Sequence, residues 1–552
     1  MGATELRAKC ATKATNFRNA FRSRQGFKQF VQTRDTALDR HGHPDSSSRW
    51  SNEDLDPTPP EKRTCLNWWQ SILVIFASQF ISSVAMFFNS RCASVYHIGY
   101  PVVARSIFGV YGSFYFVGAR AALAIIWYGV QLYSGASFMS NILRCIFGHK
   151  FTDIPNHILE SVGITTSGML AFFLFWLVHF PFCAFRPYQL RGFFWFKSII
   201  VLPAVWGLFI FCMVNTKGNI GSIYSSQIKG SKGWFIMYAI NSGMGNTATL
   251  ITNQPDIARW SKTKSGAQWS QLITNPIAVT LSASLGILAT AAINNTWGLE
   301  TPLWNPWDLL GAILDRYWSA STRFTVFLSA FTWMVSILGT NIAANMIPFG
   351  SDSSMLFPRY ITIPRGQYIV EFLAFAICPW KILSSASVFT TFLSGYGLFM
   401  ASVVAIMVCD CNVSIGHLYN PSRTNKHYYY TCGWNIQGVI AYLCGIALPF
   451  PGFVGTLGAK VSTSATDLGR LGWLLSFTVS FVVYYVLCII WPTDNQKIIK
   501  EMGLKWEEEC GDAVVAEDGT EIVEEGKQVH ARNDSSEGIP RETEMYGGQD
   551  KY

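Results

Sequence analysis

Long apolar stretches alternate with short polar connections over most of this chain. A hydrocarbon layer about 30 Å thick is crossed by about 20 apolar helical residues, and this length divides the sequence into about eleven predicted spans. They are residues 68–88, 114–138, 161–185, 193–215, 234–254, 270–293, 323–347, 366–380, 384–409, 432–454 and 470–491. Because lipid offers backbone groups no hydrogen-bond partner, continuous stretches of this length are predicted to be helices. The pattern therefore predicts an all-α integral membrane protein.

The composition agrees with this prediction. Of the 552 residues, 50% are hydrophobic and only 14% are charged, whereas about 25% charged residues are typical of a soluble domain. We expect one membrane domain over residues 66–492, preceded by a basic polar tail, residues 1–65. An acidic tail, residues 493–552, follows and is predicted to be disordered.

The distribution of arginine and lysine predicts the orientation. Short cytoplasmic loops carry an excess of these residues. Alternate loops here are basic, and we place them in the cytoplasm; they contain Arg91, Arg186, Arg259, Arg359 and Arg423. We expect the protein to lie in the plasma membrane.

Polar residues inside the predicted spans indicate where a solute is bound, because an unpaired polar group in lipid is costly. Trp127 and Gln131 lie four residues apart and therefore share one helical face. The indole offers a stacking surface, and the amide offers two donors and an acceptor. This pair suits a planar heterocycle with ring N–H and C=O groups. The alternative is a tryptophan packed between helices and a glutamine bonded across the bundle.

A second polar segment, Asn241 to Thr247, holds two glycines and two asparagines in the middle of the span at 234–254. Transporters use helices broken at such segments to direct backbone dipoles at a substrate or an ion. A close crossing of two helices through small residues explains the same composition. The sequence leaves both interpretations open.

A third polar stripe lies on the span at 323–347. Asn341 and Asn345 share a face, and Ser336 lies one turn before them. Hydroxyl and carbonyl oxygens on this stripe are suited to a cation, and the asparagine amides to a substrate. Asp352 follows just beyond the predicted end of the span.

The sequence gives no sign of an enzyme. His179 is isolated, Glu371 lies near the start of a predicted span, and no group of Cys, His, Asp or Glu has metal-ligand spacing. We therefore expect no catalytic residue, no metal and no organic cofactor. The expected partners are a small solute and the lipid bilayer, without nucleic acid, and the oligomeric state is left open.

Five motifs carry a resemblance to a known family. They are NEDLDPTPPEKRT from Asn52, RCASVYHIGYPVVARSIFGVYGS from Arg91, NQPDIARW from Asn253, GTNIAANMIPFGSD from Gly339 and LFPRYITIPRGQY from Leu356. Through them the chain, from about Asn52 to Trp491, resembles the fungal branch of the nucleobase:cation symporter-1 family. That branch includes uracil, allantoin, uridine, nicotinamide riboside and thiamine permeases. The resemblance implies an inverted-repeat transporter of the five-plus-five type that couples uptake of a heterocycle to H⁺ or Na⁺.

The resemblance also implies roles for particular residues. Trp127 and Gln131 would stack on and bond the heterocycle, and Asn345 would bind it as the second asparagine of the NIAAN motif; the neighbouring amide of Asn341 is a further candidate. Asn246 and Thr247 would line the pocket on a broken helix.

The remaining implied roles concern coupling. Asp352 matches an aspartate that is important for transport in the fungal members. Ser336, Gly339 and Thr340 would supply one side of a cation site, the other side coming from the first helix of the family.

That first helix has no counterpart in this sequence. In the family it follows the PPEKRT-like stretch, whereas here Thr64 and Cys65 run directly into LNWWQS. About eleven spans therefore compare with twelve in the family. Beside a symporter, the sequence leaves open a sensor that binds without transporting, or a shortened and inactive splice form.

Overall fold

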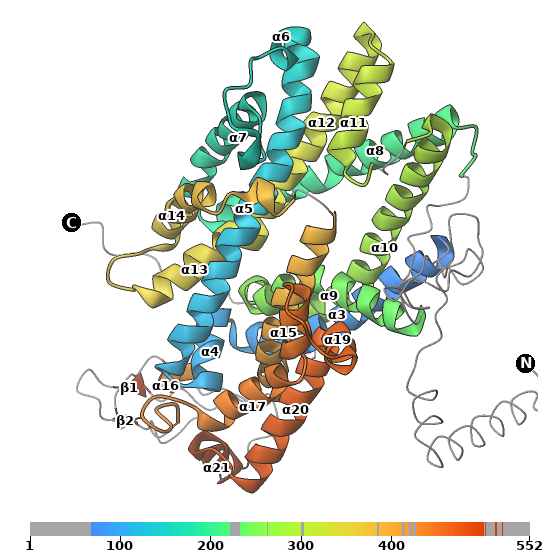
Figure 1. Ribbon diagram of the computed structural model, residues 1–552. Coiled ribbons are helices and arrows are strands. Elements are labelled where there is room, and N and C mark those ends of the chain that lie inside the picture. Colours follow the sequence, from blue (N-terminus) through green and yellow to red (C-terminus); the bar gives the residue numbers. More distant parts are fainter. Residues whose placement is uncertain are drawn as a thin grey trace, which may run out of the picture. The chain divides into compact units, whose positions relative to one another are not determined.

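The computed structural model describes residues 68–220, 232–261, 263–299, 303–383, 386–410, 415–418, 423, 425, 427–501, 503, 514–515 and 521–522. This part of the chain is almost entirely helical (Figure 1). The first half contains α3 (Trp68–Tyr96), α4 (Tyr100–Phe108), α5 (Gly112–Phe147), α6 (His149–Thr152), η2 (Glu160–Val162), α7 (Thr166–His179), η3 (Phe180–Ala184), η4 (Pro187–Leu190), α8 (Arg191–Asn215), α9 (Lys232–Ala258) and α10 (Lys264–Trp297).

The second half begins with α11 (Pro306–Arg316), α12 (Ala320–Asn341), the π-helical turn η5 (Ile342–Met346), α13 (Ile347–Leu356), α14 (Ile363–Ala376), η6 (Pro379–Lys381) and α15 (Ala386–Cys409). It continues with α16 (Ile415–Leu418), α17 (Ile436–Ala447), α18 (Phe450–Thr456), α19 (Thr463–Arg470), α20 (Gly472–Ile490) and α21 (Asp494–Glu501). Two short strands, β1 (Val514–Val515) and β2 (Glu521–Ile522), pair antiparallel.

Within these described residues, 8 helices are long and apolar enough to cross a membrane, or 9 if the bent pair α17 and α18 forms one span. The other predicted spans, at 234–254 and 366–380, coincide with α9 and α14. Every predicted span therefore falls on a helix, which confirms the all-α membrane class.

Local signals fix several helix ends. Proline occupies an early position of α4, α11 and α14, where its missing N–H costs no helical hydrogen bond. Side-chain oxygens cap other starts, for example Thr165 accepting from Gly168 N at 3.1 Å and Ser319 accepting from Thr322 N at 3.1 Å. These caps satisfy amide groups that the helix itself leaves unpaired.

Extensive helix pairs join spans that are five apart in chain order. The helix α3 packs along α10, and α5 packs along α12. Spans separated by an odd number run in opposite directions through a membrane. The pairing is therefore the one that an inverted repeat of five helices produces.

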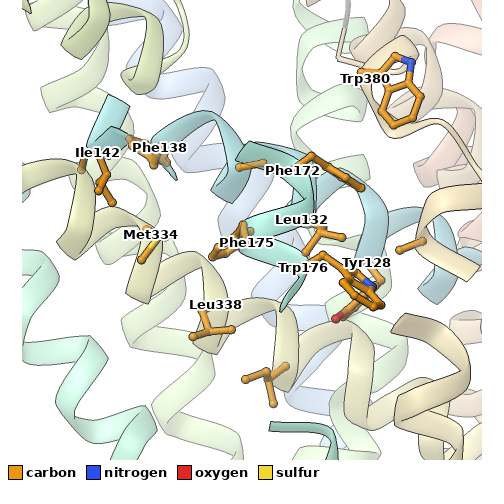
Figure 2. Packing of buried hydrophobic residues seen from close by; sticks show 14 of the residues in the cluster. Tyr128, Leu132, Phe138, Ile142, Phe172, Phe175, Trp176, Met334, Leu338 and Trp380 are labelled. Atoms are coloured by element: carbon orange, nitrogen blue, oxygen red, sulfur yellow. The ribbon is translucent and has the colours of Figure 1, made fainter. Parts of the chain in front are cut away.

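A hydrophobic cluster extends along α5 and joins it to α7 and α12. Figure 2 shows Tyr128 and Leu132 of α5 beside Phe175 and Trp176 of α7, with Met334 and Leu338 contributed by α12. Gly135 lets the ring of Phe175 lie directly against the α5 backbone. This core fixes the position of the α5 face that carries Trp127 and Gln131.

The helix α9 is continuous, so the broken helix implied at Asn241 to Thr247 is absent. Its glycines instead allow close packing. A Cβ on Gly243 would lie 2.5 Å from Ser78 Oγ of α3, and one on Gly245 would lie 2.5 Å from the carbonyl oxygen of Leu393 on α15. The close-crossing interpretation is therefore the correct one here.

An irregular turn is found in a different helix, the continuous run formed by α12, η5 and α13. The five residues of η5 form a π-turn within an otherwise continuous helix from Ala320 to Leu356. Asp352 is consequently inside this helix and fully buried, not beyond the end of a span as predicted. Similarly, α21 forms an ordered helix at the start of the expected tail, with Asn495 and Ile499 buried.

Candidate functional site

Trp127 lies on α5 at its junction with α15. Its indole is buried and packs against Phe392 and Tyr396, with ring centroids 5.8 and 6.0 Å away. Gln131, one turn later on α5, is half-buried and makes no hydrogen bond to the described part of the chain. The predicted pair therefore combines a held aromatic ring with an amide whose hydrogen-bonding groups are available.

The two asparagines of the NIAAN motif are linked to each other and to α5. Asn345 Nδ2 donates to Asn341 Oδ1 at 2.9 Å, and Asn341 Nδ2 donates to the carbonyl oxygen of Tyr128 at 3.2 Å. Asn341 Nδ2 also lies 3.4 Å from His179 Nε2. The amide of Asn341 is thus used internally. The side-chain oxygen of Asn345, Oδ1, accepts no hydrogen bond from the described residues. Asn345 therefore remains able to bind a ligand through this oxygen.

The π-turn brings this pair against α9. Asn253 Nδ2 of α9 donates to the carbonyl oxygen of Ala344 at 2.8 Å, directly beside Asn345. π-Turns widen a helix locally and recur at functional sites. Asn345 is therefore held from two directions, by α5 through Asn341 and by α9 through Asn253. Neither partner was predicted from the sequence as a support for this residue.

The two predicted α9 residues have different environments. Thr247 is buried, and its Oγ1 is 2.9 Å from Ser82 Oγ of α3, so it connects two helices. Asn246 is exposed and makes no hydrogen bond to the described residues. Tyr396 of α15 donates its hydroxyl to the carbonyl oxygen of Gly245. The structure thus brings α9 and Trp127 into one neighbourhood through Tyr396, with Thr247 facing α3.

The predicted cation ligands contact a lysine. Lys197 Nζ of α8 donates to Thr340 Oγ1 at 2.8 Å, and Thr340 Oγ1 donates to the carbonyl oxygen of Ser336 at 2.9 Å. A Cβ on Gly339 would lie 2.5 Å from Lys197 Cδ. The predicted ligands Gly339 and Thr340 therefore both lie against the side chain of Lys197, and Ser336 is linked to it through Thr340. Sequence reasoning missed Lys197, although a lysine inside the span at 193–215 was a visible signal.

Asp352 is part of a buried charge cluster, which we call the Arg120 cluster: Arg120, Asp256, Asp352, Asn253 and Tyr100. Arg120 makes a two-pronged ion pair with Asp352, in which Nε lies 2.9 Å from Oδ2 and NH2 reaches Oδ1. Its NH1 lies 2.7 Å from Asp256 Oδ2. The guanidinium carbon is 3.8 Å from the centre of the Tyr100 ring.

The Arg120 cluster connects four helices. Arg120 comes from α5, Asp352 from α13, Asp256 from α9 and Tyr100 from α4, whose backbone N–H donates to Asp256 Oδ1 at 3.2 Å. The arginine side chain is only 2% exposed. A charge this deeply buried is normally retained for function. An arginine in the predicted span at 114–138 was again the signal that sequence reasoning passed over.

A second buried acid, Glu371, is connected to Asn341 through Tyr128, which bonds both residues. Glu371 is in the middle of α14, which begins at Ile363, and not near a helix start as predicted. Its carboxylate accepts from the Tyr128 hydroxyl, and its backbone oxygen accepts from Trp176 Nε1 at 2.9 Å. His179, expected to be isolated, has Nδ1 3.2 Å from the carbonyl oxygen of Phe175 and Nε2 beside Asn341. These contacts fit a neutral imidazole protonated on Nδ1.

Among the described residues no group of three or more His, Cys, Asp and Glu side chains is arranged to hold a metal ion. What the site offers is a stacking ring, two available amides and several charged groups that are paired with one another. This arrangement is suited to reversible binding of a polar, planar solute.

Comparisons with known proteins agree with these features. Residues 63–476 match the sequence profile of a family described as permeases for cytosine/purines, uracil, thiamine and allantoin. The allantoin permease of Saccharomyces cerevisiae is 33% identical over 491 residues, covering 83% of this chain and 77% of the permease. The uracil permease of the same yeast is 34% identical over 478 residues, covering 82% and 75%.

Solved structures show the same fold. An inward-facing conformation of Mhp1 superposes with a TM-score of 0.59 at 19% identity, covering 80% of this chain and 89% of Mhp1. A closed conformation of Mhp1, a nucleobase-cation-symport-1 family transporter with bromovinylhydantoin bound, gives 0.60 at 18% identity, covering 80% and 90%. The expected inverted-repeat transporter fold is thereby confirmed, and the relatives are permeases and not enzymes. The chain is a multi-pass membrane protein that belongs to the cytosine/purine, uracil, thiamine and allantoin permease family.

Proposed function

We propose that this protein imports a neutral planar heterocycle, such as uracil, allantoin or uridine, across the plasma membrane. The supporting observation is that Trp127 and Gln131 lie one turn apart on α5, and that Asn345 is linked through Asn341 to Tyr128 of the same helix. Stacking on an aromatic ring contributes about 0.5–1.5 kcal/mol beyond burial, and each amide adds directional recognition of ring N–H and C=O groups.

The buried charges favour a neutral substrate over a cationic one. The two carboxylates of the Arg120 cluster, Asp256 and Asp352, are paired with Arg120, and the carboxylate of Glu371 accepts from the Tyr128 hydroxyl. A cationic ligand such as thiamine or nicotinamide riboside would have to displace that arginine or rely on cation–π contact with Trp127. Relatives named as thiamine and nicotinamide riboside transporters are less similar, at 23–26% identity.

Competition binding tests this substrate class. Purified protein in detergent is incubated with radiolabelled uracil, and unlabelled uracil, allantoin, uridine and thiamine compete in turn. Displacement by a neutral heterocycle, with a weaker effect of thiamine, is the expected result. Preferential displacement by thiamine would overturn the proposed substrate class.

The coupling ion of this proposal is the proton. Lys197 places an ammonium group against Thr340 and its methylene chain against Gly339, and this positive charge disfavours Na⁺ at the same position. The lysine has no acidic partner among the described residues, so its proton is held only by neutral oxygens. Loss and regain of this proton would bias the inward and outward states, because an ion shifts an equilibrium only by preferring one state.

A lysine substitution tests the coupling. Lys197→Met keeps the length of the side chain without a titratable group, and we expect uptake to lose its dependence on an inward proton gradient while substrate exchange persists. Lys150→Met, at an exposed lysine, serves as the matched control. Stimulation of the unmodified protein by a Na⁺ gradient alone would contradict proton coupling.

The sensor and the inactive splice form are not favoured, because the family and the named relatives are permeases. The junction at Thr64 and Leu66, where the first family helix would be inserted, lies outside the described residues. A fluorescent fusion imaged in a fungal host would test the plasma-membrane assignment.

A further inference from the structure

A cavity of about 590 Å³ lies where several of the basic loops meet. Four chain segments form it: the connection between α3 and α4, the turn η4, the end of α9 and the start of α14. Its lining residues are His97, Arg186, Pro187, Arg259, Trp260, Thr362, Ile363 and Pro364. The sequence predicted these loops to lie on the cytoplasmic side, and this cavity brings them together.

The cavity is electropositive. Arg186 and Arg259 both line it, no carboxylate does, and neither arginine has an ion-pair partner in the part of the chain that the structure describes. The Arg259 guanidinium carbon lies 5.0 Å from the centre of the Trp260 ring. The 14-residue helix α14 begins at this cavity, and its N-terminus adds a partial positive charge beside the arginines. Two guanidinium groups and a helix N-terminus are together suited to a phosphate group.

Exposed aromatic residues flank the cavity along the chain. Phe185 precedes Arg186, Trp260 follows Arg259 and Tyr360 precedes Thr362, with exposed fractions of 43%, 57% and 67%. Tryptophan and tyrosine are enriched where a membrane protein meets the lipid headgroups. We therefore expect the cavity to lie near the depth of the phospholipid headgroups. Basic pockets between membrane helices on the cytoplasmic side bind anionic headgroups.

The α9 wall of the cavity is continuous with the Arg120 cluster. Arg259 follows Asp256 by one helical turn. A Cβ on Gly99 would lie 2.6 Å from Asp256 Oδ1 and 3.1 Å from Arg259 NH1, so both side chains contact the same glycine. The carbonyl oxygen of Arg259 is also 2.9 Å from His97 Nδ1.

The α14 wall reaches the same cluster from the other side. The carbonyl oxygen of Ile363 would lie 2.8 Å from a Cβ on Gly350, and Gly350 is two residues before Asp352. The start of α14 therefore packs without intervening side chain against the helix that carries Asp352. The α9 wall is therefore next to Asp256, and the α14 wall is next to the helix that carries Asp352.

We propose that this cavity binds the phosphate headgroup of an anionic phospholipid, and that the bound lipid stabilises the conformation in which Arg120 is paired with both Asp256 and Asp352. A phosphate between Arg186, Arg259 and the start of α14 joins α9 to α14. Separation of these two helices would open the Arg120 cluster. Anionic lipid at this site is therefore a regulator of the inner side of the transporter.

Lipid binding to the purified protein tests this directly. In a neutral detergent, dioleoyl-phosphatidylglycerol is added at increasing concentration, with dioleoyl-phosphatidylcholine and inorganic phosphate as separate arms. The melting temperature and the lipid retained in native mass spectrometry are measured. We expect the anionic lipid to raise the melting temperature and remain bound, and the other two probes to have little effect.

Substitutions locate the site. Arg186→Gln with Arg259→Gln should remove the response, and each single change should weaken lipid binding by about fivefold, the change equivalent to about 1 kcal/mol. Arg359→Gln alters an exposed arginine that does not line the cavity, and should respond like the unmodified protein. If the double variant is poorly folded without lipid, the single Arg186→Gln variant, at an exposed position, provides the same comparison.

Three outcomes would overturn the proposal. They are an unchanged response in the arginine variants, equal stabilisation by phosphatidylcholine, and full reproduction of the effect by inorganic phosphate, which would indicate a soluble anion. None of these readouts needs a transported substrate. The proposed lipid site is therefore tested independently of the proposed transport function.

Discussion

Arg120 and its two carboxylates, Asp256 and Asp352, form a buried ion-pair cluster that joins separate helices. Removing one partner of a buried ion pair costs about 3–5 kcal/mol, because the remaining charge is left without compensation. Arg120 has two partners, however, and Asp256 remains when Asp352 is changed. The loss of either acid should therefore destabilise the protein without unfolding it.

We predict that Asp352→Asn lowers the melting temperature and strongly reduces uptake, and that adding Asp256→Asn costs more than the sum of the two single changes. Asp315→Asn is the matched control, since its pair with Arg144 is largely exposed on the acid side and exposed pairs contribute about 0–1 kcal/mol. Thermal unfolding in detergent measures the stability of each variant, and a transport assay measures its uptake. Equal effects of Asp352→Asn and Asp315→Asn would show that burial of the Arg120 cluster has no energetic consequence.

Gln131 and Trp127 require different substitutions, because only Trp127 is part of a packed core. Gln131→Ala should weaken uracil or allantoin binding by about 1–3 kcal/mol, which is roughly 5- to 150-fold, since a substrate polar group then loses its partner. Trp127→Phe keeps most of the packing and should weaken binding less. Ser137→Ala, on the same helix, removes only the hydrogen bond from the Ser137 hydroxyl to the backbone oxygen of Tyr133 one turn earlier. This change should leave binding unchanged. Unaltered affinity in the Gln131→Ala variant would remove that residue from the site.

At the scale of elements, the glycines of α9 act through helix packing. Gly245→Ala would place a Cβ 2.5 Å from a backbone oxygen of α15, which cannot move aside as a side chain would. We expect this change to cost about 1–3 kcal/mol. Gly286→Ala, in the middle of α10 with open space around it, should be neutral or slightly stabilising because alanine favours helix. Melting temperatures of the two variants would decide, and a tolerated Gly245→Ala would contradict the close crossing of α9 and α15.

The same elements show what the sequence could predict. The spans followed from hydropathy, because lipid imposes a simple length and composition on helices. Asn241 to Thr247 remained ambiguous, since a helix break and a close crossing both need small residues. The deciding contact is Leu393 on α15, far away in the chain. The π-turn at Ile342 to Met346 has no separate signature in the motif that encodes it.

The candidate site shows a similar division. Trp127, Gln131 and Asn345 were found because a family motif and helical spacing both indicated them. Asp352 was placed beyond its helix, because its polar neighbours resemble a loop and its partner Arg120 comes from α5. Lys197 was overlooked for a comparable reason, since its contact with Thr340 joins two helices distant in sequence.

At the scale of the whole molecule, helix pairs five spans apart and the fold shared with Mhp1 indicate two inverted structural repeats. Several polar contacts cross between α9 and the helices that carry the NIAAN motif and Asp352: Asn253 to Ala344, and Arg120 to both Asp256 and Asp352. Asn345 and Thr340, which contacts Lys197, belong to the same helical run, and under the proposed function this run offers a route for coupling substrate and proton.

The most direct test of this account is uptake by the 552-residue chain reconstituted into proteoliposomes. Radiolabelled uracil and allantoin are supplied outside, with an inward proton gradient, an inward Na⁺ gradient or neither, and protein-free vesicles as the blank. The account predicts saturable, concentrative uptake of at least one of these heterocycles that depends on the proton gradient and collapses when a protonophore is added. Substrate binding of normal affinity without any flux under all three conditions would contradict it.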